Sequence, residues 1–258
     1  MLLATWNVNG IRARSPRLLE WLAARKPDVV CLQELKATDD DFPYLELRAA
    51  GYHAVIAGQT SWNGVAILAK EPPELVVSEL VGAADAGARF IVARASGLEV
   101  ASVYIPNGKT LEHPDYKVKL AFLSRLAAHV EERKGRAPFV LGGDFNVCRT
   151  PRDSYGGESF EGHIFCTQEE RAQVGRLVDA GLVDLFRAKE PEDPGFTWWD
   201  YRFGAFHKKM GMRLDMLLAT PDVAARVTSV TVDRDYRKKS AAGAIPSDHA
   251  PLLAELTG

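Results

Sequence analysis

Acid, amide and histidine side chains follow several short apolar runs in this sequence. One run, Pro138-Phe139-Val140-Leu141, leads through Gly142 and Gly143 to Asp144 and Asn146. Glycines here predict a tight turn that a ligand can approach closely, and the apolar strand gives both polar groups a rigid base. A carboxylate and an amide two residues apart face the same way if strand geometry continues. The pair could hold a metal ion, a water molecule, or both.

Other polar residues stand at the ends of predicted strands along the whole chain. In order they are Asn7 and Asn9, Glu34, Tyr104 with Asn107, Asp144 with Asn146, Asp215, and Asp248 with His249. In layered α/β folds such strand ends can converge in one crevice. The set is rich in oxygen and lacks cysteine, which suits a hard cation such as Mg²⁺ or Mn²⁺. A histidine with a carboxylate partner suits proton transfer or charge stabilisation, so the groups together favour hydrolysis of a phosphate ester.

The composition is that of an ordinary globular chain of 258 residues, 47% hydrophobic and 26% charged. No apolar run approaches the roughly 20 residues that span a bilayer, and no signal peptide is evident, so we expect a cytoplasmic protein without membrane association. The three cysteines lack the paired spacing of a zinc site or a disulfide framework. A net charge of −2 attracts no polyanion, so any nucleic-acid binding must rest on local basic patches.

Hydrophobic periodicity predicts the elements that position the polar groups. The expected strands cover residues 2–9, 28–33, 51–57, 64–69, 75–80, 89–95, 98–105, 138–141, 196–201, 213–219 and 251–256. The five runs between residues 51 and 105 predict a mainly antiparallel sheet. Helices are expected from Ser15-Pro16 to about Lys26, from Tyr116 to Arg133, and from an N-cap at Thr167 to about Ala180.

Two segments rich in turn or basic residues, 149–161 and 233–246, are predicted surface loops. The chain has no linker, low-complexity tract or convincing repeat. A single domain over residues 1–258, with two packed sheets flanked by helices, therefore fits the pattern best.

Seven short motifs occur in order along the chain. They are Trp6–Arg12, Leu32–Glu34, Asn63–Leu68, Tyr104–Gly108, Gly143–Val147, Arg213–Asp215 and Ser247–Pro251. Together they resemble the signatures of the exonuclease III family, which contains the class II AP (apurinic/apyrimidinic) endonucleases of the endonuclease/exonuclease/phosphatase superfamily. The resemblance runs from about residue 1 to residue 254. The segment Phe196–Tyr201 favours the nuclease branch over the sphingomyelinase and inositol-phosphatase branches.

The resemblance implies a DNase I-like fold, a four-layered αββα sandwich of two mixed sheets flanked by helices. It implies a Mg²⁺-dependent DNA repair nuclease, with Mn²⁺ as a substitute, that cleaves 5′ to abasic sites and processes 3′ ends as an exonuclease, phosphodiesterase or phosphatase. The partner would be double-stranded DNA with abasic sites or blocked 3′ ends. The protein is expected to act as a monomer.

The same likeness assigns roles to the polar residues. The metal site would be formed by Glu34 as principal ligand with Asn7, Asp248, Asp144, Asn146 and His249. Asp144 would activate the attacking water and Asn146 would orient it, while Asp215 would hold His249 against the scissile phosphate. Whether Asp144 or His249 is the general base stays open, because the groups can titrate as a coupled set. The number of metal ions, one or two, also stays open.

The remaining implied residues would contact the substrate. Tyr104 and Asn107 would reach phosphate oxygens. Trp198, Met212 and Leu214 match positions around an extruded abasic sugar, and Met212 stands where some relatives have an aromatic residue. Asn9 replaces an Asp found in part of the family, which removes one charge from the metal site. Backbone phosphates would meet a set of basic residues, Lys109, Arg202, His207, Lys208, Lys209, Arg213, Arg234, Arg237, Lys238 and Lys239.

Two other functions compete with this hypothesis. A phosphatase or phosphodiesterase of the same superfamily, acting on a lipid or small-molecule phosphate, would share the cation site, but Trp198-Trp199 and the flanking lysines argue against it. A non-catalytic DNA-binding relative is disfavoured because every polar position of the site is filled. Taken alone, Gly142-Gly143-Asp144 is typical of an ordinary strand-to-turn junction. The hypothesis therefore depends on the ordered set of motifs.

Overall fold

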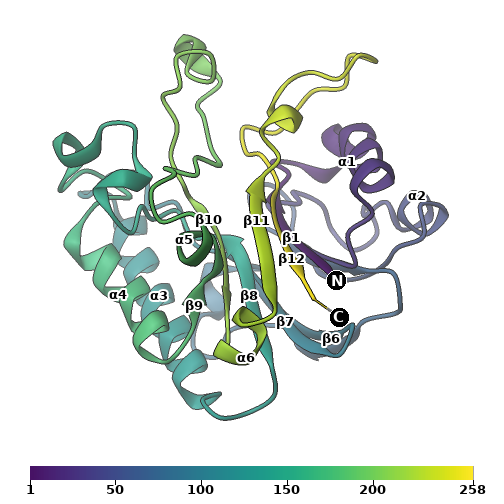
Figure 1. Ribbon diagram of the computed structural model, residues 1–258, viewed down its shortest axis with the longest axis horizontal. Coiled ribbons are helices and arrows are strands. Elements are labelled where there is room, and N and C mark those ends of the chain that lie inside the picture. The colour runs from purple at the N-terminus through teal and green to yellow at the C-terminus, as the bar shows by residue number, and fades with distance from the viewer. Residues whose placement is uncertain (258) are drawn as a thin grey trace.

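The computed structural model describes residues 1–257 and contains two six-stranded mixed sheets stacked face to face (Figure 1). The first sheet, in strand order, has β11 (Val227–Val232), β12 (Leu252–Leu256), β1 (Leu2–Asn7), β2 (Val29–Gln33), β4 (Val65–Ala69) and β3 (His53–Ala57). The second, in strand order, has β5 (Glu74–Val77), β6 (Phe90–Ala95), β7 (Leu98–Tyr104), β8 (Phe139–Asp144), β10 (Asp215–Ala219) and β9 (Val183–Asp184).

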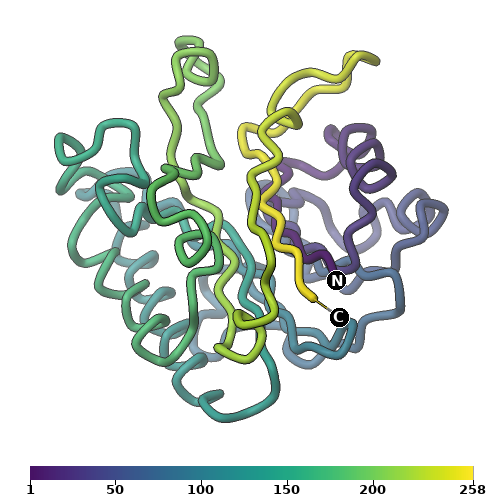
Figure 2. Tube along the Cα trace, in the orientation of Figure 1, coloured from purple at the N-terminus to yellow at the C-terminus, as the bar shows by residue number. Residues whose placement is uncertain are grey.

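Helices form the two outer layers of the sandwich (Figures 1 and 2). The helices are α1 (Ile11–Arg25) and α2 (Tyr44–Ala49) beside the first sheet, α3 (Pro114–Glu132) and α4 (Gln168–Asp179) beside the second, and the short α5 (Leu185–Lys189) and α6 (Pro221–Ala224). None of the helices within residues 1–257 has the length and apolar character needed to cross a membrane. The predicted four-layered αββα sandwich is confirmed.

Strand alternation explains how one strand supplies two cores. On β1, Leu3 packs between the sheets, whereas Ala4 and Trp6 face α1, where Trp6 meets Trp21 with ring centroids 5.4 Å apart. On β8, Val140 packs between the sheets while its neighbours Phe139 and Leu141 pack against α3 and α4. Each fully buried aliphatic or Phe side chain contributes about 1.5–3 kcal/mol. The sheets are therefore held on both faces, and their ends are rigid.

Strand pairing brings the predicted polar residues to one edge of the sandwich. β1 and β2 are parallel, with Asn7 opposite Gln33, so that Glu34 follows immediately at the same edge. β7 and β8 are also parallel, with Tyr104 opposite Asp144. β10 runs antiparallel to β8, and its first residue, Asp215, lies opposite Asp144. Asp144 therefore has Tyr104 and Asp215 as direct neighbours on its two sides.

The first helix begins earlier than predicted. It starts at Ile11, whose N–H donates to the Leu35 carbonyl at 2.8 Å, and not at Ser15-Pro16. The Ser15 hydroxyl donates to the Ile11 carbonyl within the helix, so it does not act as an N-cap. Pro16 lies inside the helix, where its missing N–H removes a single i→i−4 bond. By contrast, Thr167 caps α4 through the predicted capping box.

Two strand predictions are wrong. The five runs between residues 51 and 105 do form antiparallel pairs, but β3 and β4 belong to the first sheet and β5, β6 and β7 to the second. Residues 196–201 form no strand, only isolated bridges from Trp198 to Met212 and to His249. The bent backbone places the Thr197 and Trp198 N–H groups on one acceptor, the Met212 carbonyl, at 2.9 Å each. Strands β9 and β11 and helices α2, α5 and α6 were not predicted.

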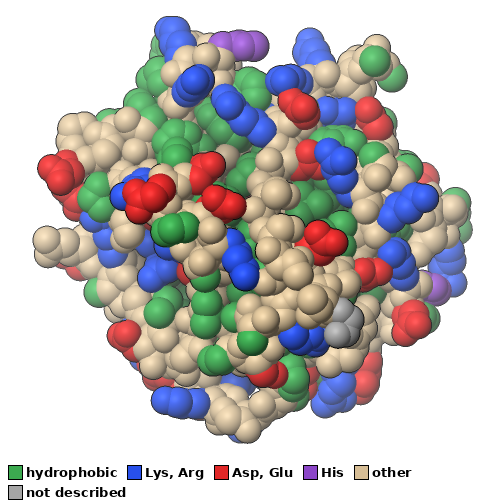
Figure 3. All heavy atoms as spheres, in the orientation of Figure 1, with side chains coloured by type: hydrophobic (Ala, Val, Ile, Leu, Met, Phe, Trp, Pro, Cys, Tyr) green, Lys and Arg blue, Asp and Glu red, His purple; other side chains and the backbone are tan. Residues whose placement is uncertain are grey.

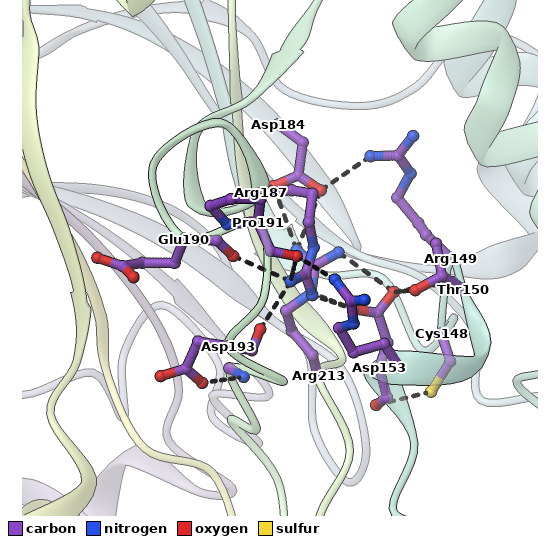
Figure 4. Close-up of polar contacts among 12 residues, drawn as sticks. Cys148, Arg149, Thr150, Asp153, Asp184, Arg187, Glu190, Pro191, Asp193 and Arg213 are labelled. Carbon is purple, nitrogen blue, oxygen red and sulfur yellow. Dashed lines mark hydrogen bonds and ion pairs between the residues drawn. The ribbon is translucent and has the colours of Figure 1, made fainter. Parts of the chain in front are cut away.

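The segment 149–161 is not a surface loop throughout. It contains two short 3₁₀ turns, Pro151–Asp153 and Gly157–Phe160, and Asp153 at the end of the first is fully buried. Asp153 Oδ1 accepts a hydrogen bond from Arg213 Nε at 2.7 Å (Figure 4). Figure 4 also shows Arg187 reaching Asp153 and Asp184 reaching Arg213, while Arg149 reaches Asp184. Asp153 and Arg213 are 60 residues apart in the chain, so no local sequence pattern indicates that they form a buried ion pair.

Candidate active site

A small cavity of about 150 Å³ opens where the polar strand ends meet. Its lining residues are Asn7, Glu34, Tyr104, Asn107, Asp144, Asn146, Phe165, Trp198, Leu214, Asp248 and His249. Every one except Phe165 was predicted from the sequence as a site residue. The convergence of the strand ends in one crevice is therefore confirmed.

At the back of the cavity, His249 lies between two buried carboxylates. Its Nδ1 is 2.7 Å from Asp215 Oδ2, and its Nε2 is 3.7 Å from Asp144 Oδ2. Asn7 Nδ2 donates to the same Asp144 oxygen at 2.9 Å. One side-chain N or O atom from each of Asp144, Asp215 and His249 lies within 4.8 Å of the others. The arrangement can hold a cation or move a proton.

Asp144 and His249 have different protonation states near neutral pH. Burial raises the pKa of Asp144 to about 7, and nearby Asp215 adds to the rise while His249 opposes it. Burial alone would lower the pKa of His249, but the adjacent Asp215 and Asp144 outweigh it and raise the pKa to about 10. Near neutral pH, Asp144 can therefore exchange a proton while His249 remains a cation. Burial also raises the pKa of Tyr104 well above its usual value, so its hydroxyl stays a neutral donor.

Asp144 and Asn146 meet through a turn and not through strand alternation as predicted. The tight turn predicted at Gly142 and Gly143 is wrong, because both belong to β8. A Cβ on Gly143 would lie 2.0 Å from the Val103 carbonyl oxygen, so glycine is required by the close approach of β7. The chain turns at Asn146, which has a φ of 50°. Its backbone N–H and its side-chain amide donate to the two oxygens of Asp144 at 2.9 and 3.3 Å.

Glu34 lies on the opposite wall beside a lysine that was not predicted. Lys36 Nζ is 3.2 Å from Glu34 Oε1 and donates to Asn9 Oδ1 at 2.6 Å. Asn9 Nδ2 in turn donates to Asp248 Oδ1 at 2.8 Å. The only sequence signal for Lys36 is its position two residues after Glu34. A polar chain thus links Glu34 to Asp248 along the cavity rim.

The predicted apolar residues lie on the remaining side of the cavity. Trp198 and Leu214 line it, and Trp198 Nε1 also donates to Asp248 Oδ2 at 3.0 Å. Met212 is buried in the same apolar cluster but does not line the cavity. Phe165, which does line it, has a φ of 73° and lies just before the Thr167 helix cap. No sequence pattern indicated Phe165, since it lies in an irregular segment.

The predicted DNA-contacting basic residues lie outside the cavity. Lys109 borders a neighbouring cavity of about 570 Å³ that also includes Glu34 and Tyr104, and it pairs with Asp115. Arg202, which pairs with Asp200, belongs with Lys208 and Lys209 to a projecting loop that carries basic side chains in Figure 3. In Figure 1 this loop and the one before β12 rise on two sides of the sandwich edge.

Two members of the predicted basic set are not available to DNA. Arg213 is 1% exposed and pairs with Asp153 and Asp184, so the prediction that it contacts DNA is wrong. Arg237 is only 8% exposed, and its guanidinium donates to the Trp199 carbonyl at 3.1 Å. Its guanidinium also lies over the Tyr201 ring, 4.7 Å from the centroid. The prediction that Arg237 contacts DNA is therefore wrong, because the side chain supports the projecting loop from inside.

The donor set fits a hard divalent cation. Glu34, Asp144, Asp215 and Asp248 bring carboxylate oxygens to the site, against the positive groups of Lys36 and His249. Within the described residues, Asp215 Oδ1 is buried and has no hydrogen-bond partner. Oxygen ligands without thiolates suit Mg²⁺ or Mn²⁺. The excess negative charge is what a bound cation would neutralise.

A four-layered αββα sandwich with this acidic site at one edge defines a class of phosphoester hydrolases. The family model described as "Endonuclease/Exonuclease/phosphatase family" matches residues 4–249, and the chain belongs to this family.

Individual relatives narrow the likeness to the exodeoxyribonuclease III type. Exodeoxyribonuclease III from Haemophilus influenzae is 33% identical over 269 residues, which cover 99% of each chain. The structure of a 3′-5′ exonuclease from Neisseria meningitidis is 37% identical with a TM-score of 0.95, and that of an AP endonuclease from Archaeoglobus fulgidus is 33% identical with a TM-score of 0.93. Both comparisons cover 100% of each chain. The protein is thus an exodeoxyribonuclease III-like hydrolytic enzyme.

Proposed function

We propose that this protein is a Mg²⁺-dependent DNA repair nuclease that cleaves 5′ to abasic sites and processes 3′ ends as an exonuclease, phosphodiesterase and phosphatase. The observation that carries the proposal is the Asp144–His249–Asp215 cluster, buried at the wall of an oxygen-lined cavity. Two similar structures support the two halves of the activity, since one is named a 3′-5′ exonuclease and the other an AP endonuclease.

In this proposal, Asp144 is the general base. Its pKa of about 7 allows it to accept a proton from water near neutral pH, whereas His249, with a pKa of about 10, is already protonated. The water oxygen bonds to phosphorus, the P–O3′ bond breaks, and O3′ departs and takes a proton from solvent. Cleavage 5′ to an abasic site and removal of a 3′ nucleotide or 3′ phosphate all break this same kind of bond. Asn146, which donates to Asp144, orients the attacking water.

The remaining polar residues stabilise charge on the phosphate. Asp215 holds His249 Nδ1–H, which leaves Nε2–H free to donate to a phosphate oxygen. Tyr104 and Asn107, on the opposite side of the cavity, donate to the other phosphate oxygens. Because these donors are fixed on strand ends before substrate arrives, little reorganisation is needed during the reaction.

We assign the cation to the oxygen-rich wall. Glu34 is the principal ligand, with Asn7, Asp248 and Asp144 completing the set, and Asn146 and His249 stand beside it. When bound, Mg²⁺, or Mn²⁺ in its place, would neutralise charge on the phosphate and on the departing oxygen.

DNA binding in this proposal uses the surroundings of the cavity. Trp198 and Leu214, backed by Met212, accept the apolar face of a sugar. The exposed set Lys109, Arg202, Lys208 and Lys209 contacts backbone phosphates on double-stranded DNA. We further propose that residues 1–258 act as one domain and as a monomer in the cytoplasm.

A panel of matched substrates tests the proposal. The substrates are one duplex sequence bearing an abasic site, a 3′ phosphate or a recessed 3′ end, together with an inositol phosphate and sphingomyelin. We expect turnover of the DNA substrates that needs Mg²⁺ and stops on addition of a chelator. Turnover of the lipid or inositol substrate without DNA cleavage would contradict the proposal.

A further inference from the structure

Beneath the cavity lies a buried ion pair that the proposed mechanism does not use. Lys119 on α3 and Glu170 on α4 pair through Nζ and Oε1, and both side chains are 0% exposed. Burying two charges is costly, and well-packed apolar residues of similar volume are often equally stable in such a place. Stability alone therefore gives no reason for a charged pair here.

The contacts of the pair point towards the cavity. Lys119 Nζ donates to the Asn146 carbonyl at 2.7 Å and to the Asn107 carbonyl at 3.4 Å. Glu170 Oε1 accepts from the backbone N–H of Phe165 at 3.2 Å, and the Lys119 ammonium lies 4.8 Å from the centre of the Phe165 ring. Asn107, Asn146 and Phe165 come from three different loops, and all three line the cavity.

One of the two asparagines has a backbone conformation that needs outside support, and the other is coupled to it. Asn146 has a φ of 50°, a left-handed conformation that costs on the order of 1–3 kcal/mol outside glycine unless its surroundings fix it. Asn107 Nδ2 donates to Asn146 Oδ1 at 3.5 Å, so the two side chains are coupled. A Cβ on Gly108 would lie 3.1 Å from Lys119 Cδ, which places the lysine stem directly under the Asn107 loop.

We propose that Lys119 is a positioning residue: its ammonium holds the carbonyls of Asn107 and Asn146 so that both side-chain amides face the scissile phosphate. Glu170 keeps the ammonium in place and fixes Phe165 at the same time. The inference rests on the proposed roles of Asn107 and Asn146 in catalysis. The Lys119 ammonium, behind the cavity, thereby connects the three loops that carry Asn107, Asn146 and Phe165.

The same two helices provide a matched control. Arg176 on α4 pairs with Glu131 on α3 through Nη2 and Oε1 at 3.0 Å, and the two side chains are 37% and 47% exposed. This pair also joins α3 to α4, but neither residue lines the cavity. Arg176→Met therefore loosens the helix contact without touching the carbonyls of the asparagines.

The test compares variants that lose the Lys119 ammonium, which donates to the carbonyls of Asn107 and Asn146, with variants that keep it. Lys119→Met/Glu170→Gln removes the charges and the donor at nearly constant volume. Glu170→Gln alone removes the partner but leaves the lysine nitrogen able to donate. Each protein is assayed on the DNA substrate that the wild type cleaves fastest, well below its unfolding temperature. Side-chain amide NMR signals of Asn107 and Asn146 are recorded in parallel, so that positioning is measured even if no DNA substrate is turned over.

We expect the double variant to lose roughly 10- to 100-fold in kcat, since a misplacement of about 1 Å can cost 10²-fold. Its KM should change less than about threefold, because the lost alignment acts in the transition state. The amide signals should shift most in the double variant and less in Glu170→Gln, which should lose only part of the kcat that the double variant loses. Arg176→Met should keep near wild-type kcat and amide signals.

The proposal is overturned if the folded double variant keeps wild-type kcat and amide signals, or if Glu170→Gln loses as much kcat as the double variant. Should the double variant not fold, Lys119→Gln replaces it, because its shorter amide falls short of the Asn146 carbonyl and should also lower kcat. Absence of DNA cleavage by the wild type would count against the proposed function, and the amide signals would still decide the positioning role.

Discussion

Two buried charge clusters lie at opposite sides of the start of β10, and they are balanced differently. The arginine cluster consists of Asp153, Asp184, Arg149, Arg187 and Arg213, and the cavity cluster consists of Asp144, Asp215 and His249. In the arginine cluster three guanidinium groups surround two carboxylates, with N···O distances of 2.7 to 3.0 Å. In the cavity cluster one imidazole faces two carboxylates, with Glu34 and Asp248 nearby.

The difference separates structural from functional use of buried charge. Arg213 and its neighbours hold the pKa of Asp153 below its usual value despite burial, so that cluster is settled in one protonation state. The cavity cluster has a carboxylate with a pKa of about 7 and an unpartnered oxygen on Asp215. Excess negative charge and a carboxyl group that titrates near neutral pH are suited to catalysis, whereas carboxylates with every oxygen paired, as in Asp153 and Asp184, are suited to holding a loop.

The largest effect should come from breaking the cavity cluster. Asp215→Asn removes the charge that orients and stabilises the His249 imidazolium, so we expect kcat to fall by roughly 10²- to 10⁴-fold. Asp184→Asn in the arginine cluster is the control, since it should lower stability while the folded protein keeps most of its activity. Steady-state cleavage of a DNA duplex measures both. Equal losses of kcat in the two variants would remove the distinction between the clusters.

Removing the guanidinium group at the centre of the arginine cluster should lower the stability of the protein strongly. Arg213→Met leaves Asp153 and Asp184 buried with incomplete pairing, and we expect a loss of about 3–5 kcal/mol in the free energy of unfolding. Arg202→Met, at an exposed pair with Asp200, should change it by less than about 1 kcal/mol. Urea denaturation checks both values. A loss below about 1 kcal/mol for Arg213→Met would show that the cluster is not structural.

Adding Mg²⁺ should stabilise the folded protein only by binding in the active-site cavity. Mg²⁺ at about 100 times its Kd should raise the free energy of unfolding by roughly 2.7 kcal/mol. Glu34→Gln should abolish this increment, whereas Asp184→Asn should keep it. Thermal unfolding with and without Mg²⁺ gives the comparison. An undiminished increment in Glu34→Gln would place the cation elsewhere.

A further prediction is a pH dependence of stability in the metal-free protein. The folded pKa of His249 is raised from 6.5 to about 10, so its stabilising protonation is fully present below pH 6.5 and is lost as pH rises through about 10. Asp144, raised from 3.8 to about 7, acts in the same direction at lower pH. In EDTA, stability relative to His249→Gln should therefore fall between pH 6.5 and 10. A difference that stays constant over this range would contradict the raised pKa of His249.

The sequence predicted the cavity well because its signal is local. Each of Asn7, Glu34 and Asp144 follows or ends an apolar run, and strand ends in a layered fold meet at one edge. The two-sheet sandwich was predictable for the same reason. The assignment of strands to sheets was not predictable, since β4 and β5 are neighbours in the chain but belong to different sheets.

The residues that were missed depend on contacts between distant or irregular segments. Phe165 enters the cavity from a loop with a left-handed backbone, which no hydrophobic pattern marks. Arg237 reads as one more basic loop residue, yet it is buried under Trp199 and Tyr201. Lys119 occupies a helix position that periodicity treats as polar, and only the packing of α3 on α4 makes it a buried cation.

The central claim is that Asp144 takes the water proton in a cation-assisted hydrolysis. Single-turnover cleavage of the preferred DNA duplex by Asp144→Asn, at saturating Mg²⁺ and with folding checked by circular dichroism, tests it most directly. We expect a loss of at least about 10²-fold in the rate of bond cleavage. A rate equal to that of the wild type would contradict the claim and remove Asp144 from the reaction.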